Sequence, residues 1–342
     1  MPGARASQPT APRFSRNTSN RHPSARYPES PPERTGWIVE RRGARNRLDP
    51  RKAYAALVES ERTESGEFVA AVTVFLTNRE CPWRCLMCDL WRNTLPQSVP
   101  AGVIPEQIRE ALAGLAPARV LKLYNAGSFF DPRAIPPSDH KAIAAIAAPF
   151  ERVVVECHPA LVGAACFRFH DLIGGRLEVA IGLETAHPEA LARLNKGMTT
   201  EDFRRAAAVL LKRGIPVRAF VLVGLPFLTP EESREWCRRS VEFAFDCGCT
   251  AVALIPTRAG NGALDALAEA GDFTPPTLPM LEACLADGIA LKRGRVFADL
   301  WDLQRLTACK ACFPGRAARL AHMNLGQTIA PGVPCPDCGG PP

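Results

Sequence analysis

Short apolar runs alternate with longer amphipathic stretches along most of this chain, beginning near residue 67. Several of the short runs are unbroken Val, Ile, Leu and Ala, which is typical of parallel strands that helices cover on both faces. The amphipathic stretches predict helices between them, two of which have Thr200 and Thr229 as candidate N-caps. The alternation therefore predicts an α/β fold with a parallel sheet, either doubly wound or curled into an open barrel. The predicted strands are residues 68–76, 120–124, 153–156, 177–183, 217–223 and 251–255.

The two ends of the chain lack this alternation. Residues 1–35 are rich in Pro, Ser, Arg and Asn, with almost no aliphatic side chains, so we expect a disordered basic tail. An RNA-binding arm, a transit peptide and a solvated tail without a specific partner all fit its composition. Residues 36–66 regain an amphipathic pattern and are expected to form a helix leading into the first strand. The barrel core is then assigned to residues 67–260 and a C-terminal extension to residues 261–342.

Composition narrows the class of protein. A chain of 342 residues with 46% hydrophobic and 23% charged residues is typical of a globular protein. It has no apolar run of the roughly 18–20 residues that a membrane span needs, and its N-terminus lacks the apolar core of a secretory signal. The net charge of +7 belongs to residues 1–52, which hold twelve Lys and Arg against four acids. The rest of the chain is therefore about neutral.

Cysteine spacing indicates metal binding. Thirteen cysteines are present, and seven of them fall at 81–88, 309–312 and 335–338. An odd number in such tight clusters argues against a secreted disulfide framework and in favour of metal ligands in a reducing compartment. We therefore expect a cytoplasmic protein with no membrane partner.

The first cluster directly follows the first predicted strand. Cys81, Cys85 and Cys88 form a C-x3-C-x2-C array, and thiolates so close in sequence can converge on one soft metal centre. A structural zinc ion would need a fourth ligand, and none is evident in the next residues. A four-iron cluster held by three cysteines keeps one iron open for another ligand.

This spacing resembles the cluster-binding signature of the radical S-adenosylmethionine (SAM) enzymes. The resemblance implies a 4Fe–4S cluster whose open iron binds the amino and carboxylate groups of SAM. One electron from a donor such as flavodoxin or ferredoxin then produces a 5′-deoxyadenosyl radical. It also implies a partial (β/α)6 barrel similar to a TIM barrel. Met87 and His158 depart from the family pattern, where an aromatic residue and, in related branches, an arginine are usual.

Polar residues at the predicted strand ends are the candidates for binding SAM, since ligands of α/β folds lie at the carboxyl ends of strands. By analogy with the family, Asn125, Gly127 and Ser128 follow the second strand as cofactor residues. Glu156 and Glu184 end the third and fourth strands and can accept hydrogen bonds from ribose hydroxyls and the SAM ammonium. The two carboxylates could instead form an acid/base pair. No residue is assigned to the chemistry on the substrate.

Further segments narrow the resemblance. Residues 127–132, 182–185, 194–199 and 224–229 are similar to the radical SAM branch that holds the Elongator catalytic subunit and the archaeosine synthase radical SAM subunit. Residues 70–260 carry this similarity, which implies tRNA as substrate. A small metabolite or peptide substrate, or a non-catalytic nucleic-acid-binding protein, are the alternatives. Arg258, in the loop after the last strand, is a candidate to bind a substrate carboxylate or phosphate, or is a solvated charge.

Two C-x2-C pairs lie near the C-terminus, separated by 22 residues. Four thiolates in this arrangement are typical of a structural zinc site, although an auxiliary iron–sulfur cluster could use the same ligands. The ligands are Cys309, Cys312, Cys335 and Cys338. The other six cysteines are expected to fill the core.

Overall fold

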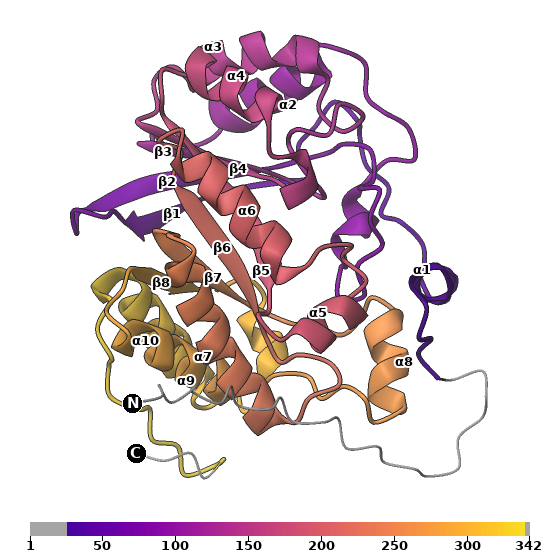
Figure 1. The fold of residues 1–342 in the computed structure, drawn as a ribbon. Coiled ribbons are helices and arrows are strands. Elements are labelled where there is room, and N and C mark those ends of the chain that lie inside the picture. The colour runs from indigo at the N-terminus through magenta and orange to yellow at the C-terminus, as the bar shows by residue number, and fades with distance from the viewer. Residues whose placement is uncertain (1–25, 339–342) are drawn as a thin grey trace, which may run out of the picture.

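The computed structural model describes residues 26–338, which form an α/β barrel (Figure 1). One eight-stranded sheet has its strands in chain order, so that each strand pairs with the next. β2 through β8 are parallel to one another, and β1 pairs antiparallel with β2. The strands are β1 Ala55–Arg62, β2 Phe68–Leu76, β3 Val120–Asn125, β4 Arg152–Glu156, β5 Leu177–Glu184, β6 Val217–Val223, β7 Ala251–Pro256 and β8 Arg295–Ala298.

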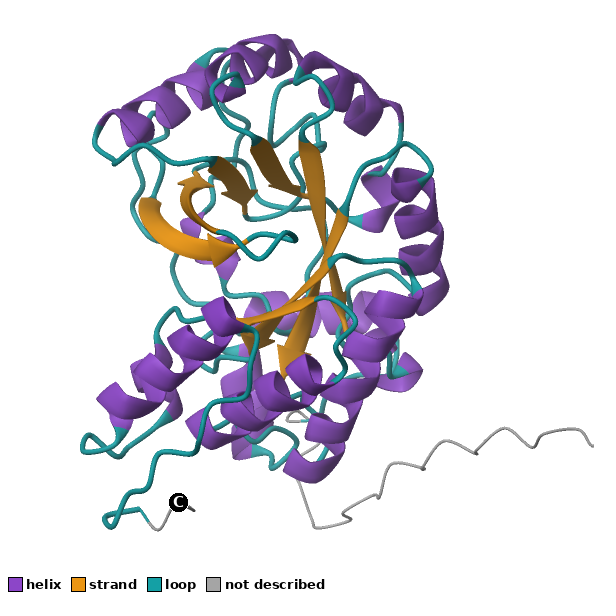
Figure 2. Ribbon diagram, turned by 90° about the vertical axis from the view of Figure 1, so that its left-hand side faces the viewer, coloured by secondary structure: helices purple, strands orange, loops and turns teal. Residues whose placement is uncertain are grey.

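Helices surround the curled sheet, as the view turned by 90° shows (Figure 2). The longer ones begin at the signals that the sequence carries. Thr229 accepts the Glu232 N–H at 3.2 Å and the Glu232 carboxylate accepts the Thr229 N–H at 2.9 Å, a capping box that starts α7. The cap of α6 is Thr199, one residue before the predicted Thr200. The α-helices are α1 Pro31–Glu40, α2 Val103–Ala113, α3 His140–Ala147, α4 Ala164–Leu172, α5 Pro188–Arg193, α6 Thr200–Leu211, α7 Pro230–Asp246, α8 Ala263–Glu269, α9 Leu278–Ala290 and α10 Phe313–Gly326. Single 3-10 turns occur at η2 Leu90–Asn93, η3 Pro137–Asp139, η4 Pro159–Leu161 and η5 Leu303–Leu306. Among residues 26–338, none of these helices has both the length and the apolarity needed to cross a bilayer.

All six predicted strands are present, and the barrel architecture is confirmed, but with eight strands where six were expected. The expectation of a helix through residues 36–66 is wrong after Glu40, where α1 ends: residues 41–54 form no helix, and residues 55–62 form β1. That strand reads as polar because Glu59 and Glu61 point into the barrel, where cations from other strands balance them. β8 is only four residues long and starts with a buried arginine. Both strands therefore lack the apolar run on which the prediction relied.

The N-terminal segment is ordered further upstream than expected. α1 begins at Pro31, inside the predicted tail, because Tyr27, Trp37 and Ile38 are buried against the loop that follows β2 and against α8. The rest of the predicted tail, residues 1–25, lies outside the described residues, so the expectation of disorder there stays a prediction. The Gly339–Gly340 end of the chain likewise lies outside them.

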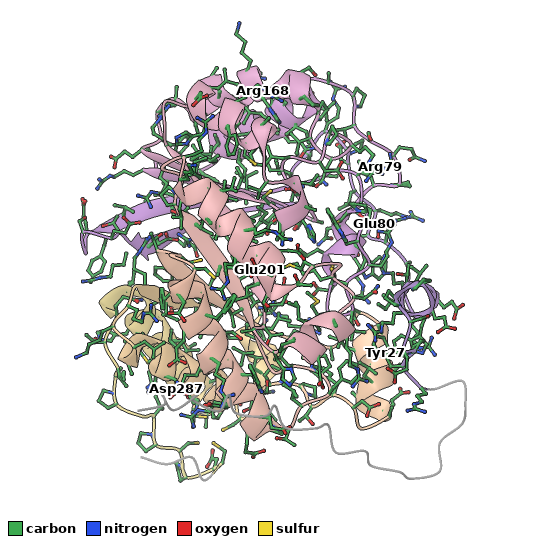
Figure 3. The ribbon with its side chains drawn as sticks, viewed as in Figure 1. Tyr27, Arg79, Glu80, Arg168, Glu201 and Asp287 are labelled. Carbon is green, nitrogen blue, oxygen red and sulfur yellow. The ribbon has the colours of Figure 1, made fainter. Side chains whose placement is uncertain are left out.

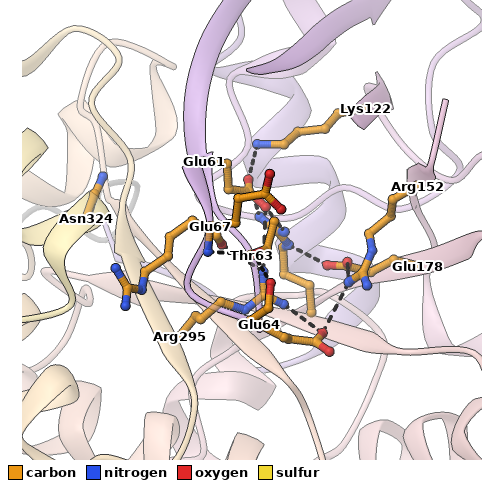
Figure 4. A network of polar contacts seen from close by, with 12 residues as sticks. Glu61, Thr63, Glu64, Glu67, Lys122, Arg152, Glu178, Arg295 and Asn324 are labelled. Atoms are coloured by element: carbon orange, nitrogen blue, oxygen red, sulfur yellow. Dashed lines mark hydrogen bonds and ion pairs between the residues drawn. The ribbon is translucent and has the colours of Figure 1, made fainter. Parts of the chain in front are cut away.

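The barrel interior is charged at the amino ends of the strands. Arg218 of β6 binds Glu61 of β1 through two nitrogens, at 2.6 and 3.1 Å, and Glu178 of β5 at 2.8 Å. Lys122 of β3 binds Glu61 at 2.5 Å. Burial would raise the pKa of Glu61, but Arg218 and Lys122 hold it well below its usual range. Four acids and four bases make this balanced network, which we call the charged floor (Figure 4): Glu59, Glu61, Glu64, Lys122, Arg152, Glu178, Arg218 and Arg295.

Candidate functional site

Cys81, Cys85 and Cys88 lie in the loop that follows β2, at the carboxyl end of the barrel; we call residues 77–99 the cluster loop. Backbone pairing fixes this loop, since the Leu86 N–H donates to the Leu194 carbonyl at 2.9 Å. The Asn261 amide donates to the carbonyls of Leu86 and Cys88, at 2.8 and 3.3 Å. The three cysteines are thus held by loops that follow β5 and β7, which are distant in sequence.

Charge also fixes the beginning of the cluster loop. The Glu80 carboxylate is an ion-pair partner of Arg42 at 2.6 Å, of Arg84 at 3.3 Å and of Arg45. In the view of Figure 3 Glu80 lies on the same flank as Tyr27, where α1 covers the loop. The segment between α1 and β1 therefore forms an outer cover for the cysteines.

The three thiols are half-buried, which opposes their ionisation. Burial raises the pKa of Cys81 and Cys85, and raises the pKa of Cys88 to about 12. The nearby Lys196 ammonium partly offsets this effect for Cys85 and Cys81. Without a metal these thiols are protonated, so binding of a metal cluster would release protons.

The residues after β3 approach the cluster loop closely. A Cβ on Gly127 would lie 3.1 Å from the Cβ of Cys81, so glycine permits this approach. Asn125 is 1% exposed, and neither its amide nitrogen nor its amide oxygen has a hydrogen-bond partner among the described residues. A buried amide without a partner costs free energy unless a ligand satisfies it. Ser128 is buried as well, but its hydroxyl accepts the His158 N–H at 3.4 Å and so joins the ends of β3 and β4.

Glu156 ends β4 beside Asn125. Its carboxylate accepts the backbone N–H of Asn125 at 2.9 Å. Burial raises the pKa of Glu156 to about 8, against the lowering effect of the Asn125 N–H and of Lys196, while the Glu184 charge adds to the rise. An acid of this kind changes its protonation state near neutral pH, so its charge can respond to a cationic or hydroxyl-bearing ligand.

Glu184 ends β5 at an irregularity of the sheet, where the pairing with β6 shifts register. Its φ of 64° is left-handed, which is strained for a non-glycine residue. This backbone aims the carboxylate at Lys196, with which it forms a buried ion pair. A Cβ on Gly182 would overlap both charged groups, so the glycine is needed to accommodate the pair.

Lys196 is the site residue that sequence reasoning missed. It is 9% exposed, and although burial lowers the pKa of a lysine, the Glu184 carboxylate raises that of Lys196 above its usual value. A single lysine in a loop has no pattern that marks it, although its place after a strand-end Glu could have suggested a partner. Its effects on Cys81, Cys85 and Glu156 put it at the electrostatic centre of the site.

His158 lies in the position where related branches have arginine. Its uncharged ring contacts both the cluster loop and Lys196. Its ring stacks on Trp83 of the cluster loop, with centroids 3.6 Å apart and an interplanar angle of 14°. The Ala160 N–H donates to His158 Nδ1 at 3.2 Å, so Nε2 carries the proton and donates to the Lys196 carbonyl at 3.1 Å. Burial and the Lys196 cation lower the pKa of His158 to about 4. The histidine therefore positions the cluster loop and Lys196 without adding charge.

Arg258 is neither a solvated charge nor an open anion site. Its guanidinium binds the Asp299 carboxylate and the Trp301 carbonyl, each at 2.6 Å. It thereby ties the loop after β7 to the loop after β8.

The four C-terminal cysteines converge as their spacing predicts. Their sulfurs all lie within 4.8 Å of one another, with Cys309 Sγ 3.7 Å from Cys335 Sγ and Cys312 Sγ 3.7 Å from Cys338 Sγ. The backbone N–H of Cys312 lowers the pKa of Cys309 to about 7, which favours the thiolate that metals bind. This group, separate from the cluster loop, can hold a metal ion.

Comparison with known proteins agrees with this geometry. Residues 75–239 match the model of the Radical SAM superfamily. Archaeosine synthase subunit beta of Methanosarcina acetivorans is 27% identical over 229 residues, which is 63% of this chain and 65% of that protein. The subunit of the same name from Thermococcus kodakarensis is 29% identical over 166 residues, 46% of this chain and 51% of that protein. The chain thus spans about half to two-thirds of these relatives.

A solved structure shows the same fold. The crystal structure of methylornithine synthase (PylB) superposes with a TM-score of 0.51 at 14% identity, covering 75% of this chain and 69% of that chain. The similarity to archaeosine synthase subunits confirms the branch that the sequence motifs indicated. The barrel, the cysteine array at its carboxyl end and the matched domain together identify this chain as an enzyme of the radical SAM superfamily.

Proposed function

We propose that this enzyme uses a radical generated from SAM to modify a base of tRNA. The observation that carries the tRNA part is the similarity to archaeosine synthase subunits, which extends over 63% of the chain in one case. The match to the Radical SAM superfamily, over residues 75–239, includes most of the cluster loop and the strand ends that would surround SAM. The protein would work in the cytoplasm with a reduced electron donor such as flavodoxin or ferredoxin.

The residues present fit a cluster with one open iron. Cys81, Cys85 and Cys88 would be its ligands, and the approach of Gly127 to Cys81 leaves backbone next to it. When bound, the reduced cluster supplies the electron that cleaves the sulfonium of SAM to give a 5′-deoxyadenosyl radical. The protein's own part is to bind and orient SAM and to exclude water from it.

The unsatisfied amide of Asn125 supports a role in binding SAM, since both of its polar atoms lack a partner in the described part of the chain. Glu156 and Glu184 offer carboxylates for the ribose hydroxyls and the ammonium. Gly127 gives room for the methionine portion. Ser128 would not contact SAM. Its hydroxyl accepts the His158 N–H and so holds the residues after β4 in place.

For the C-terminal cysteines we propose one zinc ion. A tetrahedral ion with Zn–S bonds of about 2.3 Å separates its sulfurs by about 3.8 Å. Two of the sulfur pairs are 3.7 Å apart, which supports this assignment. In a four-iron cluster each thiolate binds a different corner, and the sulfurs would lie farther apart.

Anaerobic reconstitution tests the proposal. The wild-type protein with dithionite should convert SAM to 5′-deoxyadenosine, whereas Cys85→Ala should not; Cys247→Ser, at the end of α7, is the matched control. Nucleoside mass spectrometry of tRNA from a strain without the gene should show one modification lost or replaced by its precursor. SAM cleavage with an unchanged tRNA profile would reject the tRNA substrate and favour a small metabolite or peptide. Reconstituted protein that never cleaves SAM would reject radical chemistry.

A further inference from the structure

The side chains inside the barrel are charged at the amino ends of the strands and aromatic toward the carboxyl ends. Above the charged floor lie the rings of Phe75, Tyr124 and Phe220, which meet edge to face; we call them the aromatic layer. Phe75 and Tyr124 have centroids 6.1 Å apart, and Tyr124 and Phe220 have centroids 5.9 Å apart. Tyr124 is followed by Asn125 and lies near Glu156, whose charge helps to raise the pKa of Tyr124, after burial as the main cause. The aromatic layer therefore separates the charged floor from the proposed cofactor site.

The aromatic layer reaches the surface at Trp301. Its ring lies 5.7 Å from that of Phe75, at an interplanar angle of 62°. Nevertheless 47% of Trp301 is exposed, and the adjacent Leu300 is 38% exposed. A tryptophan so exposed loses the burial that would otherwise stabilise the fold.

The backbone holds Trp301 in this position. Its N–H donates to the Asp299 carboxylate at 3.0 Å, and its carbonyl accepts from Arg258 at 2.6 Å. Arg305 donates to the Ala259 carbonyl at 2.6 Å, which ties the two loops together a second time. Asp302, the next residue, has a left-handed φ of 53°. The indole is therefore presented by a rigid loop, a property of binding surfaces more than of accidental exposure.

Tyr54 connects this surface with the cluster loop. Its ring centroid lies 5.6 Å from that of Phe75. The Tyr54 N–H donates to the carbonyl of Phe75 at 2.9 Å, so Tyr54 lies beside the end of β2, where the cluster loop begins. Tyr54, Phe75 and Trp301 thus form a continuous aromatic rim from the end of β2, next to the cluster loop, to the surface.

Basic residues directly precede this rim. Residues 41–52 carry six Lys and Arg against one acid. The Asn46 N–H donates to the Arg92 carbonyl at 2.9 Å, so this segment lies along the cluster loop. Within the described part of the chain five of the six cations pair with acids, namely Glu40, Glu80, Glu106 and Glu110. The exposed Arg47 is the cation left to attract a phosphate backbone.

We propose that the aromatic rim binds an unstacked nucleobase of the RNA substrate, with Trp301 stacked on its face. This inference rests on the proposed tRNA function and adds the residue that would recognise the base. Flat aromatic rings match a planar heterocycle, and single unpaired bases are the parts of RNA that proteins stack on aromatic side chains. The basic segment would contact the neighbouring phosphates.

The test compares Trp301→Ala, Trp301→Phe and a control in the full-length reconstituted protein. Phe68→Ala is the matched control, because Phe68 is 58% exposed at the opposite end of β2. The probe is total tRNA from a strain without the gene, with its dissociation constant measured by filter binding. We expect Trp301→Ala to weaken binding by about tenfold or more, the range of base–aromatic stacking. Trp301→Phe should recover most of it and Phe68→Ala should bind like wild type.

Each result has a separate meaning. SAM cleavage without RNA should be equal in all four proteins, which shows that the site is intact. If wild type binds tRNA and Trp301→Ala binds equally well, the aromatic rim is not the base-binding surface, while the proposed function stands. An equal loss in Phe68→Ala would likewise overturn the assignment, since stacking at the rim cannot explain it. If wild type neither binds nor modifies tRNA, the proposed function fails and this inference fails with it.

Discussion

The buried carboxyl of Glu156 should make the cofactor-free protein less stable as the pH rises. Its pKa of about 8 lies above the ordinary 4.5. Between these values the folded chain keeps a proton that the unfolded chain releases, so the unfolded state gains stability with increasing pH. The whole difference corresponds to about 5 kcal/mol, at 1.36 kcal/mol per pH unit, as an upper bound.

Glu156→Gln tests this reasoning because an amide cannot ionise and can still accept the Asn125 N–H. We expect the variant to be more stable than wild type by about 2–5 kcal/mol near pH 8, and by less than about 1 kcal/mol near pH 5. The measurement is urea unfolding of both proteins, free of metal and SAM, followed by circular dichroism at each pH. The same variant should bind SAM more weakly after reconstitution.

Glu269→Gln, on the exposed surface of α8, reports what an amide substitution does outside the site. A stability difference between Glu156→Gln and wild type that is the same near pH 5 and near pH 8 would refute the argument. So would a variant that is less stable than wild type throughout. In either case folding would not raise the pKa of Glu156.

Three further substitutions follow from the geometry. Gly127→Ala brings a Cβ within 3.1 Å of the Cys81 Cβ and should lower the iron content after reconstitution several-fold, while the secondary structure by circular dichroism stays unchanged; full iron content would contradict it. Gly182→Ala should push apart the Glu184–Lys196 pair and raise the dissociation constant for SAM at least tenfold by calorimetry, with iron content retained; unchanged affinity would show that this pair does not shape the SAM site. Cys312→Ser should remove the C-terminal metal, seen as zinc content falling from about one per chain to near zero by elemental analysis, and iron in place of zinc in wild type would favour a second cluster.

The apolar pattern predicted the parts of the barrel that ordinary burial stabilises. β2 and β6 were predicted with their observed bounds because both are almost entirely apolar, with Thr73 and Arg218 as their single polar residues. β1 was missed because its inward side chains are Glu59 and Glu61, and only the folded barrel brings Lys122 and Arg218 next to them. A pattern of polar residues cannot show in advance which strands will neutralise them.

The residues of the site likewise divide into those that a local sequence pattern predicts and those that only tertiary contacts define. The two cysteine arrays are readable because neighbouring ligands in sequence are also neighbours in space. Lys196 depends on a left-handed Glu184, a shifted register in β5 and a histidine that holds its carbonyl. Trp301 depends on Arg258 from the loop after β7, which donates to its carbonyl, and on Arg305 of its own loop, which donates to Ala259. Such residues acquire their roles from tertiary contacts, which no local spacing encodes.

The charged floor also sets the limits of what can be separated from this protein. The segment that matches the superfamily begins at residue 75, after Glu61, and ends at residue 239, before Arg295. Cut at those limits, the chain would retain three floor cations, Lys122, Arg152 and Arg218, with Glu178 as their only remaining floor acid. One unbalanced buried cation costs about 3–5 kcal/mol, a large part of the stability of an ordinary domain. The segment that matches the superfamily is therefore shorter than the unit that folds. Any truncated or grafted version of this enzyme has to include β1.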